Sequence, residues 1–161
     1  ADDPTSGLDV TVQAQVLELL KRIQAELGLA IVLVTHDLGV VAEMCDTVVV
    51  MYGGKVAELG PADTVYNEPK HPYTQRLLEA FPDLSRGTDA ARRGQDLATI
   101  PGTPPRLNAL PPGCRFSPRC QQSMEICTRI APGLLDTAAP GAGARHLAAC
   151  HLLNGTEARG S

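Results

Sequence analysis

The first 37 residues combine an acidic pair, a helical pattern and a short apolar run. Asp2 and Asp3 lie next to the first residue, and apolar residues recur at helical spacing over Val10–Leu27. Residues 30–34 form a continuous run rich in β-branched side chains, which is typical of a strand buried on both faces of a parallel sheet. His36 follows that run, at the strand end where α/β sheets bind ligands. This order predicts an α/β fold with a polar site at one edge of a parallel sheet.

These side chains suit phosphate chemistry. A carboxylate pair can hold Mg²⁺ through water and orient an attacking water, and a histidine at a strand end can reach a γ-phosphate. Taken singly, an Asp-Asp-Pro-Thr run is more often a solvated turn, and a lone histidine after a strand is more often structural. The two features at this separation instead predict the rear half of a nucleotide-hydrolysing site.

The residues around this site resemble segments of ABC ATPases. Residues 2–9 are similar to their Walker B end and D-loop, and residues 34–38 are similar to their switch-histidine segment. The resemblance implies that Asp2 lies on the Mg²⁺ side of the site. It also implies that His36 contacts the γ-phosphate of ATP.

Three more residues take roles from the same resemblance. Asp3 stands where the family usually has a glutamate as general base. Aspartate reaches about 1 Å less far, and a misplacement of about 1 Å can cost roughly a hundredfold in rate, so slow hydrolysis is predicted. Ser6 and Asp9 belong by resemblance to the D-loop, which crosses the interface between two ATPase subunits. Asp9 equally fits an ordinary helix N-cap.

The front half of such a site is missing from this sequence. The chain contains no Gly-x-x-x-x-Gly-Lys-Ser/Thr loop to cradle phosphates and no Leu-Ser-Gly-Gly-Gln signature. The expected architecture is therefore the C-terminal portion of a P-loop-type ABC nucleotide-binding domain, with a parallel sheet and helices. An irregular Pro-rich and Cys-containing module is expected to follow it.

The remaining pattern predicts short elements. Helices are expected from Leu38 to Cys45, from Pro61 onwards, and from His71-Pro72 to about Phe81, and a hairpin is expected around Tyr52-Gly53-Gly54. The predicted domains are an ATPase portion over 1–82, a linker and Pro-rich arm over 83–112, a Cys-rich module over 113–153, and a tail over 154–161.

Four cysteines in the C-terminal half form the second candidate site. Their spacing is C-x₅-C-x₆-C-x₂₂-C, at Cys114, Cys120, Cys127 and Cys150. Structural zinc prefers closer C-x₂₋₄-C pairs, and a cytosolic protein would not normally keep disulfides. Nearby arginines would offset thiolate charge, which suits an iron–sulfur cluster; they are Arg115, Arg119 and Arg129. Zn²⁺ and free or oxidised thiols stay open as alternatives, and Cys45 is expected to be an inert buried thiol.

Two further segments narrow the resemblance. Together with the cysteine motif, they resemble the C-terminal extension of the ATP-binding subunits of oligopeptide and dipeptide ABC importers. The two segments are His71-Pro72-Tyr73-Thr74 and the run from Ile100 to Pro105. In that group the four cysteines are associated with a 4Fe-4S cluster. The resemblance implies ATP and Mg²⁺ as cofactors of the parent protein. Its implied partners are a second ATP-binding subunit, in a homo- or heterodimer, two membrane permease subunits and, indirectly, a peptide-binding protein. The implied location is peripheral, on the cytoplasmic face of the cell membrane.

Composition narrows the classes of partner. The formal charge is −4 and the basic residues form no stripe, which argues against a nucleic-acid surface. No apolar run approaches the roughly 20 residues of a membrane helix, so a soluble chain that meets a membrane through partners is expected. A second class of function stays open, in which a metal-bound module without enzymatic activity docks a partner ATPase subunit or senses redox state.

Overall fold

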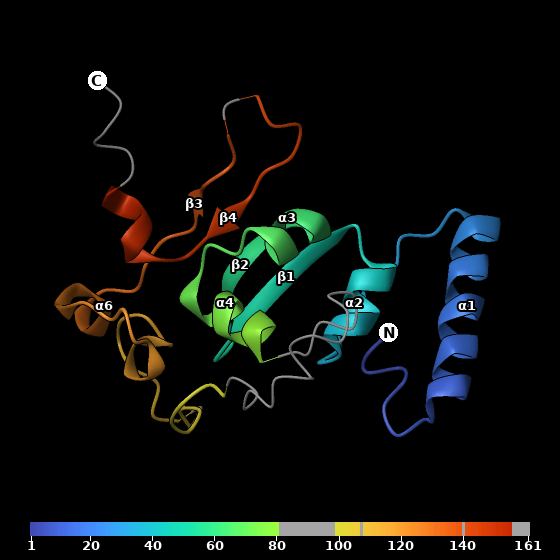
Figure 1. Ribbon diagram of the computed structural model, residues 1–161, viewed down its shortest axis with the longest axis horizontal. Coiled ribbons are helices and arrows are strands. Elements are labelled where there is room, and N and C mark those ends of the chain that lie inside the picture. Colours follow the sequence, from blue (N-terminus) through green and yellow to red (C-terminus); the bar gives the residue numbers. More distant parts are fainter. Residues whose placement is uncertain (81–98, 107, 140, 156–161) are drawn as a thin grey trace, which may run out of the picture. The chain divides into compact units, whose positions relative to one another are not determined.

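A computed structural model describes residues 1–80, 99–106, 108–139 and 141–155 (Figure 1). The chain divides into two compact units, Ala1–Asp46 and Thr47–Ser161, which are treated separately below. The predicted linker falls largely on residues 81–98, and most of the predicted tail falls on residues 156–161. Both predictions therefore lie outside the described residues.

The first unit is built on helix α1, Val10–Leu27, which forms as predicted. The Asp9 carboxylate accepts hydrogen bonds from the backbone N–H groups of Thr11 and Val12, so it satisfies two donors that the first turn leaves free. Gly28 ends the helix in the left-handed conformation, which glycine adopts without a steric cost. Helix α2, Leu38–Met44, completes the regular structure of this unit.

The strand predicted over residues 30–34 is not present as a strand. Its backbone makes one isolated parallel bridge, between Asp2 and Val34. Two hydrogen bonds flank it, from Val34 N to Ala1 O at 2.9 Å and from Asp3 N to Val34 O at 2.7 Å. Val34 is 58% exposed. An apolar run becomes a buried strand only when it has paired neighbours and covered faces, and this one has a single short neighbour.

The second unit begins with the predicted hairpin of β1, Thr47–Tyr52, and β2, Lys55–Pro61. Tyr52 faces Lys55 across the turn, and both turn residues, Gly53 and Gly54, have positive φ. Two consecutive positive φ values match the twist of the strands, and they explain the glycine pair.

The predicted parallel sheet is corrected by the structure. The four strands run in the order β1-β2-β4-β3, and every pair of neighbours is antiparallel. The outer strands β3, Leu135–Asp136, and β4, Leu147–Ala148, are two residues long each. They were not predicted, because a two-residue strand carries no readable alternation of apolar and polar residues. The sheet therefore joins the hairpin to the C-terminal part of the chain (Figure 1).

Short helices complete the second unit. Helix α3, Ala62–Asn67, packs on the hairpin, and α4, Pro72–Glu79, contacts β2 and carries proline in its first turn as predicted. The C-terminal part also contains three one-turn helices: η1, Ser117–Arg119, α6, Glu125–Arg129, and η2, His151–Gly155. None of the helices in the described part of the chain has the length and apolar character that a membrane span requires.

An aromatic cluster fixes α4 against the cysteine-bearing loop. Phe116 is 2% exposed, and its ring lies 5.2 Å from Tyr52 in an edge-on arrangement and 5.4 Å from Tyr73. The His71 ring is 6.1 Å from the same phenylalanine. Aromatic pairs at such distances contribute about 0.5–1.5 kcal/mol each beyond the area that they bury. The His71-Pro72-Tyr73 stretch thus forms part of the core of the second unit.

Candidate functional site

The first candidate site lies in the first unit, where the structure brings Asp3 and His36 together. The His36 Nδ1 atom lies 3.1 Å from Asp3 Oδ2, across 33 positions of sequence. A carboxylate oxygen only accepts hydrogen bonds, so the pair is satisfied when Nδ1 carries the proton. The Nε2 atom of the exposed ring is then directed elsewhere and can accept a proton or, once protonated, donate to a phosphate oxygen.

Asp3 is held in an unusual backbone conformation. Its φ of 44° makes it the one non-glycine residue with a positive φ in the described part of the chain. That conformation costs a non-glycine residue roughly 1–2 kcal/mol, and aspartate and asparagine tolerate it best. The backbone of Asp3 is tied on both sides, by Asp3 N to Val34 O at 2.7 Å and by Ser6 N to Asp3 O at 3.1 Å. The strained turn therefore aims the carboxylate at His36.

The other predicted residues of this site have separate surroundings. Asp2 forms the backbone bridge to Val34 and its side chain is exposed. Ser6 is exposed in the turn that follows Asp3. Asp9 caps α1, as the alternative interpretation of the sequence expected. The structure thus unites two of the five predicted residues, Asp3 and His36, through a side-chain contact.

Asp37, which was not singled out as a site residue, follows His36 directly and joins α2 to α1. Its Oδ1 atom accepts hydrogen bonds from Gly39 N at 2.8 Å and Val40 N at 3.2 Å, which caps α2. Its Oδ2 atom accepts from the Gln13 side chain of α1 at 3.2 Å. An aspartate directly before an apolar helical stretch is the sequence signal that identifies such a cap.

The second candidate site lies in the second unit, where the four predicted cysteines line one small cavity. Cys114 precedes η1, Cys120 follows it, Cys127 lies in α6 and Cys150 follows β4. The cavity is shared with side chains of other segments, namely His71, Pro72, Phe116, Ser117, Gln122, His151 and Leu152. Segments far apart in sequence thus meet around the thiols.

A close backbone approach brings two of the cysteines together. Cys114 N donates a hydrogen bond to Cys127 O at 2.8 Å. A Cβ atom on Gly113 would lie 2.3 Å from that same carbonyl oxygen, so glycine alone fits at this position. The glycine before the first cysteine therefore sets the distance between the loop and α6.

Cys127 and Cys150 are buried and Cys114 and Cys120 are partly buried, and backbone N–H groups lie close to three of the four thiols. Burial raises the pKa of Cys114, of Cys120 and of Cys150, and neighbouring cysteines raise it further. Backbone N–H groups oppose this shift: those of Phe116 and Ser117 at Cys114, Gln122 at Cys120 and Leu152 at Cys150. Such donors stabilise a thiolate, and they are among the groups by which proteins tune iron–sulfur clusters.

The described residues contain no group of side chains that is arranged to bind the predicted metal. Over the described residues, no three His, Cys, Asp or Glu side chains are arranged to hold a metal ion. The arginines expected to offset thiolate charge have other partners. Arg119 donates to Pro101 O and Ile100 O, both at 2.8 Å, and Arg129 forms an ion pair with Glu125.

A buried carboxylate that was not predicted from the sequence joins β2 to the residues before α4 and before β4. Glu58 of β2 is fully buried and accepts hydrogen bonds from Lys70 N at 2.7 Å and His71 N at 3.0 Å. Its Oε1 atom also lies 2.7 Å from His146 Nε2. A Cβ atom on Gly60 would lie 2.9 Å from the His146 ring, so this glycine makes room for the contact. A lone glutamate in the middle of an apolar strand was the available signal.

Comparisons with known proteins identify relatives of this sequence. Residues 57–127 match the family described as the oligopeptide/dipeptide transporter, C-terminal region. A putative peptide import ATP-binding protein of Brucella ovis is 50% identical over 134 residues, which are 83% of this chain and 40% of that protein. The dipeptide transport ATP-binding protein of Bacillus subtilis is 49% identical over 133 residues, 83% of this chain and 38% of that protein.

A third relative extends the match. The oligopeptide transport ATP-binding protein of Salmonella typhimurium is 49% identical over 141 residues, which are 88% of this chain and 40% of that protein. The chain thus spans about two fifths of the length of the curated relatives that it matches. The resemblance to the ATP-binding subunits of peptide importers is confirmed: the chain matches the C-terminal part of such subunits, and its residues 57–127 carry the oligopeptide/dipeptide transporter C-terminal region.

Proposed function

We propose that this chain is part of an ATP-binding subunit that couples ATP hydrolysis to the import of peptides. The observation that carries the proposal is the identity of about one half to peptide-import ATP-binding proteins over 83% of the chain. The contact between His36 and Asp3 supports it, because the histidine and the carboxylate of the expected hydrolytic site meet at 3.1 Å.

The side chains have the following proposed roles. Asp3 accepts a proton from the attacking water, and its turn holds the carboxylate in place. His36, held through Nδ1, presents Nε2 to the γ-phosphate. Asp2 helps to hold Mg²⁺ through water; the ion neutralises charge on the phosphates when it is bound. Ser6 and Asp9 contribute to the interface between two ATP-binding subunits, and Asp9 also caps α1.

The proposed partners follow from the same family. They are a second ATP-binding subunit, two membrane permease subunits and, indirectly, a peptide-binding protein. The proposed location is peripheral, on the cytoplasmic face of the cell membrane. The domain bounds proposed from the sequence are 1–82, 83–112, 113–153 and 154–161.

Substitutions at the two contacting side chains test the hydrolytic role. In the longer subunit that supplies the phosphate-binding loop, His36→Ala is expected to lower the ATPase rate about a hundredfold or more, because a positioned charge-stabilising donor is lost. Asp3→Glu is expected to raise the rate, since the longer side chain restores about 1 Å of reach. Steady-state phosphate release measures both rates.

The control is the 161-residue chain alone, which lacks the phosphate-binding loop and is expected to show no turnover. An unchanged rate in His36→Ala would contradict the proposed contact with the γ-phosphate. An unchanged rate in Asp3→Glu would show that the length of this carboxylate does not limit hydrolysis.

We further propose that Cys114, Cys120, Cys127 and Cys150 hold a 4Fe-4S cluster. Support comes from their shared cavity and from the backbone N–H groups directed at three of the sulfurs. The cluster is preferred to zinc on the spacing of the cysteines, because the sequence lacks the C-x₂₋₄-C pairs that structural zinc sites prefer.

The metal content of the anaerobically purified chain tests this proposal. About four irons per chain are expected, because one cubane takes one thiolate per iron. A broad absorption at about 400 nm is also expected. Stoichiometric zinc in place of iron would contradict the proposal in favour of a structural zinc site. A folded module without any metal would show that the cysteines act as free thiols.

A further inference from the structure

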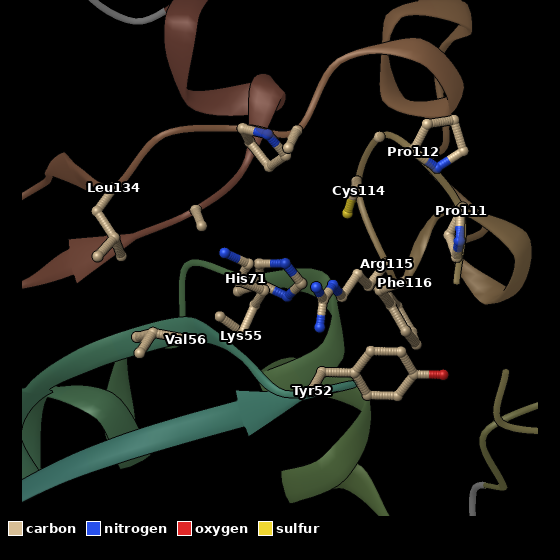
Figure 2. Close-up of a pocket in the computed structure, with 15 residues that line it drawn as sticks. Tyr52, Lys55, Val56, His71, Pro111, Pro112, Cys114, Arg115, Phe116 and Leu134 are labelled. Carbon is tan, nitrogen blue, oxygen red and sulfur yellow. The ribbon is translucent and has the colours of Figure 1, made fainter. Parts of the chain in front are cut away.

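A cavity in the second unit stands beside the cysteine site. Its volume is about 420 Å³, within the range of about 300–1,000 Å³ that is typical of small-molecule sites. The start of β2, the loop with Cys114 and the segment before β3 form its walls, as Figure 2 shows. Cys114, His71 and Phe116 line this cavity and the cysteine cavity alike.

Apart from Cys114, the charged groups of the wall are cations. Lys55 and Arg115 line the cavity, and no Asp or Glu is among the described residues that do so. His71 is the other titratable nitrogen base, and burial lowers its pKa to about 4, so its ring is neutral at neutral pH. Glu58 is close to Lys55 in sequence, but it does not line the cavity: its side chain is fully buried and has three hydrogen-bond partners. The wall therefore favours an anion.

Both cationic side chains have N–H groups that can donate hydrogen bonds to a ligand. Arg115 donates from Nη1 to Gly53 O, which fixes the guanidinium while its remaining N–H groups stay available to an acceptor. Lys55 is exposed at the start of β2, and its side-chain amino group forms no hydrogen bond or ion pair with any other residue that the structure describes. Figure 2 shows both side chains directed into the cavity, near His71.

The rest of the wall is mostly apolar. It includes Val56, Pro111, Pro112, Phe116, Pro132 and Leu134. Proline and aromatic side chains lose little conformational entropy when a ligand covers them, so such a wall binds an apolar group efficiently. A strongly hydrated dianion gains little from these surfaces, whereas a monoanion with an apolar body gains from both the cations and the apolar wall.

We propose that this cavity is a binding site for a small organic carboxylate with an apolar body. The carboxylate lies between Lys55 and Arg115, and the apolar body lies against the prolines and Leu134. Because Cys114 contributes to the same wall, the bound molecule lies beside the cysteine site.

Calorimetric titration of the full chain with a matched pair of probes tests this site. N-acetyl-leucine is expected to bind. In N-acetyl-leucinamide an uncharged carboxamide replaces the carboxylate, so this probe is expected to bind at least about tenfold more weakly, which corresponds to the loss of one charge-assisted contact. Acetate and inorganic phosphate, which lack the apolar body, are expected to bind more weakly than N-acetyl-leucine. Lys55→Gln is expected to weaken binding of N-acetyl-leucine about tenfold.

The control variant is Lys70→Gln, which removes the same charge from a lysine that pairs with Glu68 and does not line the cavity. It is expected to leave the affinity unchanged. Absence of binding by N-acetyl-leucine, equal binding of the acid and its amide, or an equal loss in the two lysine variants would overturn the proposal. Phosphate bound as tightly as N-acetyl-leucine would overturn the assignment of a carboxylate with an apolar body.

Discussion

Glu58→Ala is expected to lower the free energy of unfolding by about 3 kcal/mol or more. The substitution leaves three donors without an acceptor: His71 N and His146 Nε2, which are buried, and Lys70 N, which is partly buried. Each unsatisfied buried donor costs about 1–3 kcal/mol. Urea unfolding followed by far-UV circular dichroism measures the change, and Glu58→Gln is expected to give a smaller loss because its amide oxygen still accepts.

The matched control for this prediction is Glu68→Ala. Glu68 also lies near the start of α4, but its side chain is 70% exposed and pairs only with the Lys70 amino group. Exposed ion pairs contribute about 0–1 kcal/mol, so this variant is expected to unfold close to the parent midpoint. Equal losses in the Glu58 and Glu68 variants would show that the buried carboxylate does not hold the segments together.

Cys127→Ser is expected to abolish binding of the proposed cluster and to make the region after Pro112 sensitive to protease. Hydrophobic burial in this region is small, so bound metal is the stabilising factor expected to hold its short elements together. Cys127 is itself buried in α6 and accepts the Cys114 N–H at its carbonyl. Iron content and limited proteolysis, read on the same preparation, give the result. The same outcome is expected for serine at Cys114, Cys120 or Cys150.

Cys45→Ser is the control for the cysteine variants. This thiol is half-buried at the end of α2 in the first unit, and burial together with Asp46 raises its pKa. Serine at this position is expected to leave both iron content and the proteolytic pattern unchanged. Full iron content in Cys127→Ser would exclude that thiol as a ligand, and loss of iron in Cys45→Ser would show that the ligand set is different.

Local signals in the sequence predicted the local structure well. Helix α1 was identified from its period and from Asp9 and Gly28 at its ends, and the hairpin was identified from Gly53-Gly54. These features depend on residues close together in sequence, so backbone preference and side-chain spacing determine them. The resemblance assigned His36 and Asp3 to one site, but it did not predict the contact between them, which spans 33 positions and is seen only in the structure.

Features that depend on distant partners were missed. Residues 30–34 have the composition of a central strand, but a strand requires neighbours that composition cannot provide. Strand β4 pairs with β2 and strand β3 pairs with β4, although the two residues of each strand carry no signal of their own. The role of Glu58 depends on His146, which lies 88 positions later. Such long-range pairings are visible in the folded structure, but they cannot be predicted from a short stretch of sequence.

The pairing of β4 with β2 also has a consequence for synthesis of the chain. Until Leu147 has been made, β2 has an open edge on the side away from β1, with unpaired backbone groups that can recruit strands from other molecules. Closure must wait until β4 has been made, because β2 and β4 are far apart in sequence and such contacts form slowly. A ribosome that stalls before this point therefore releases a nascent protein with an aggregation-prone edge.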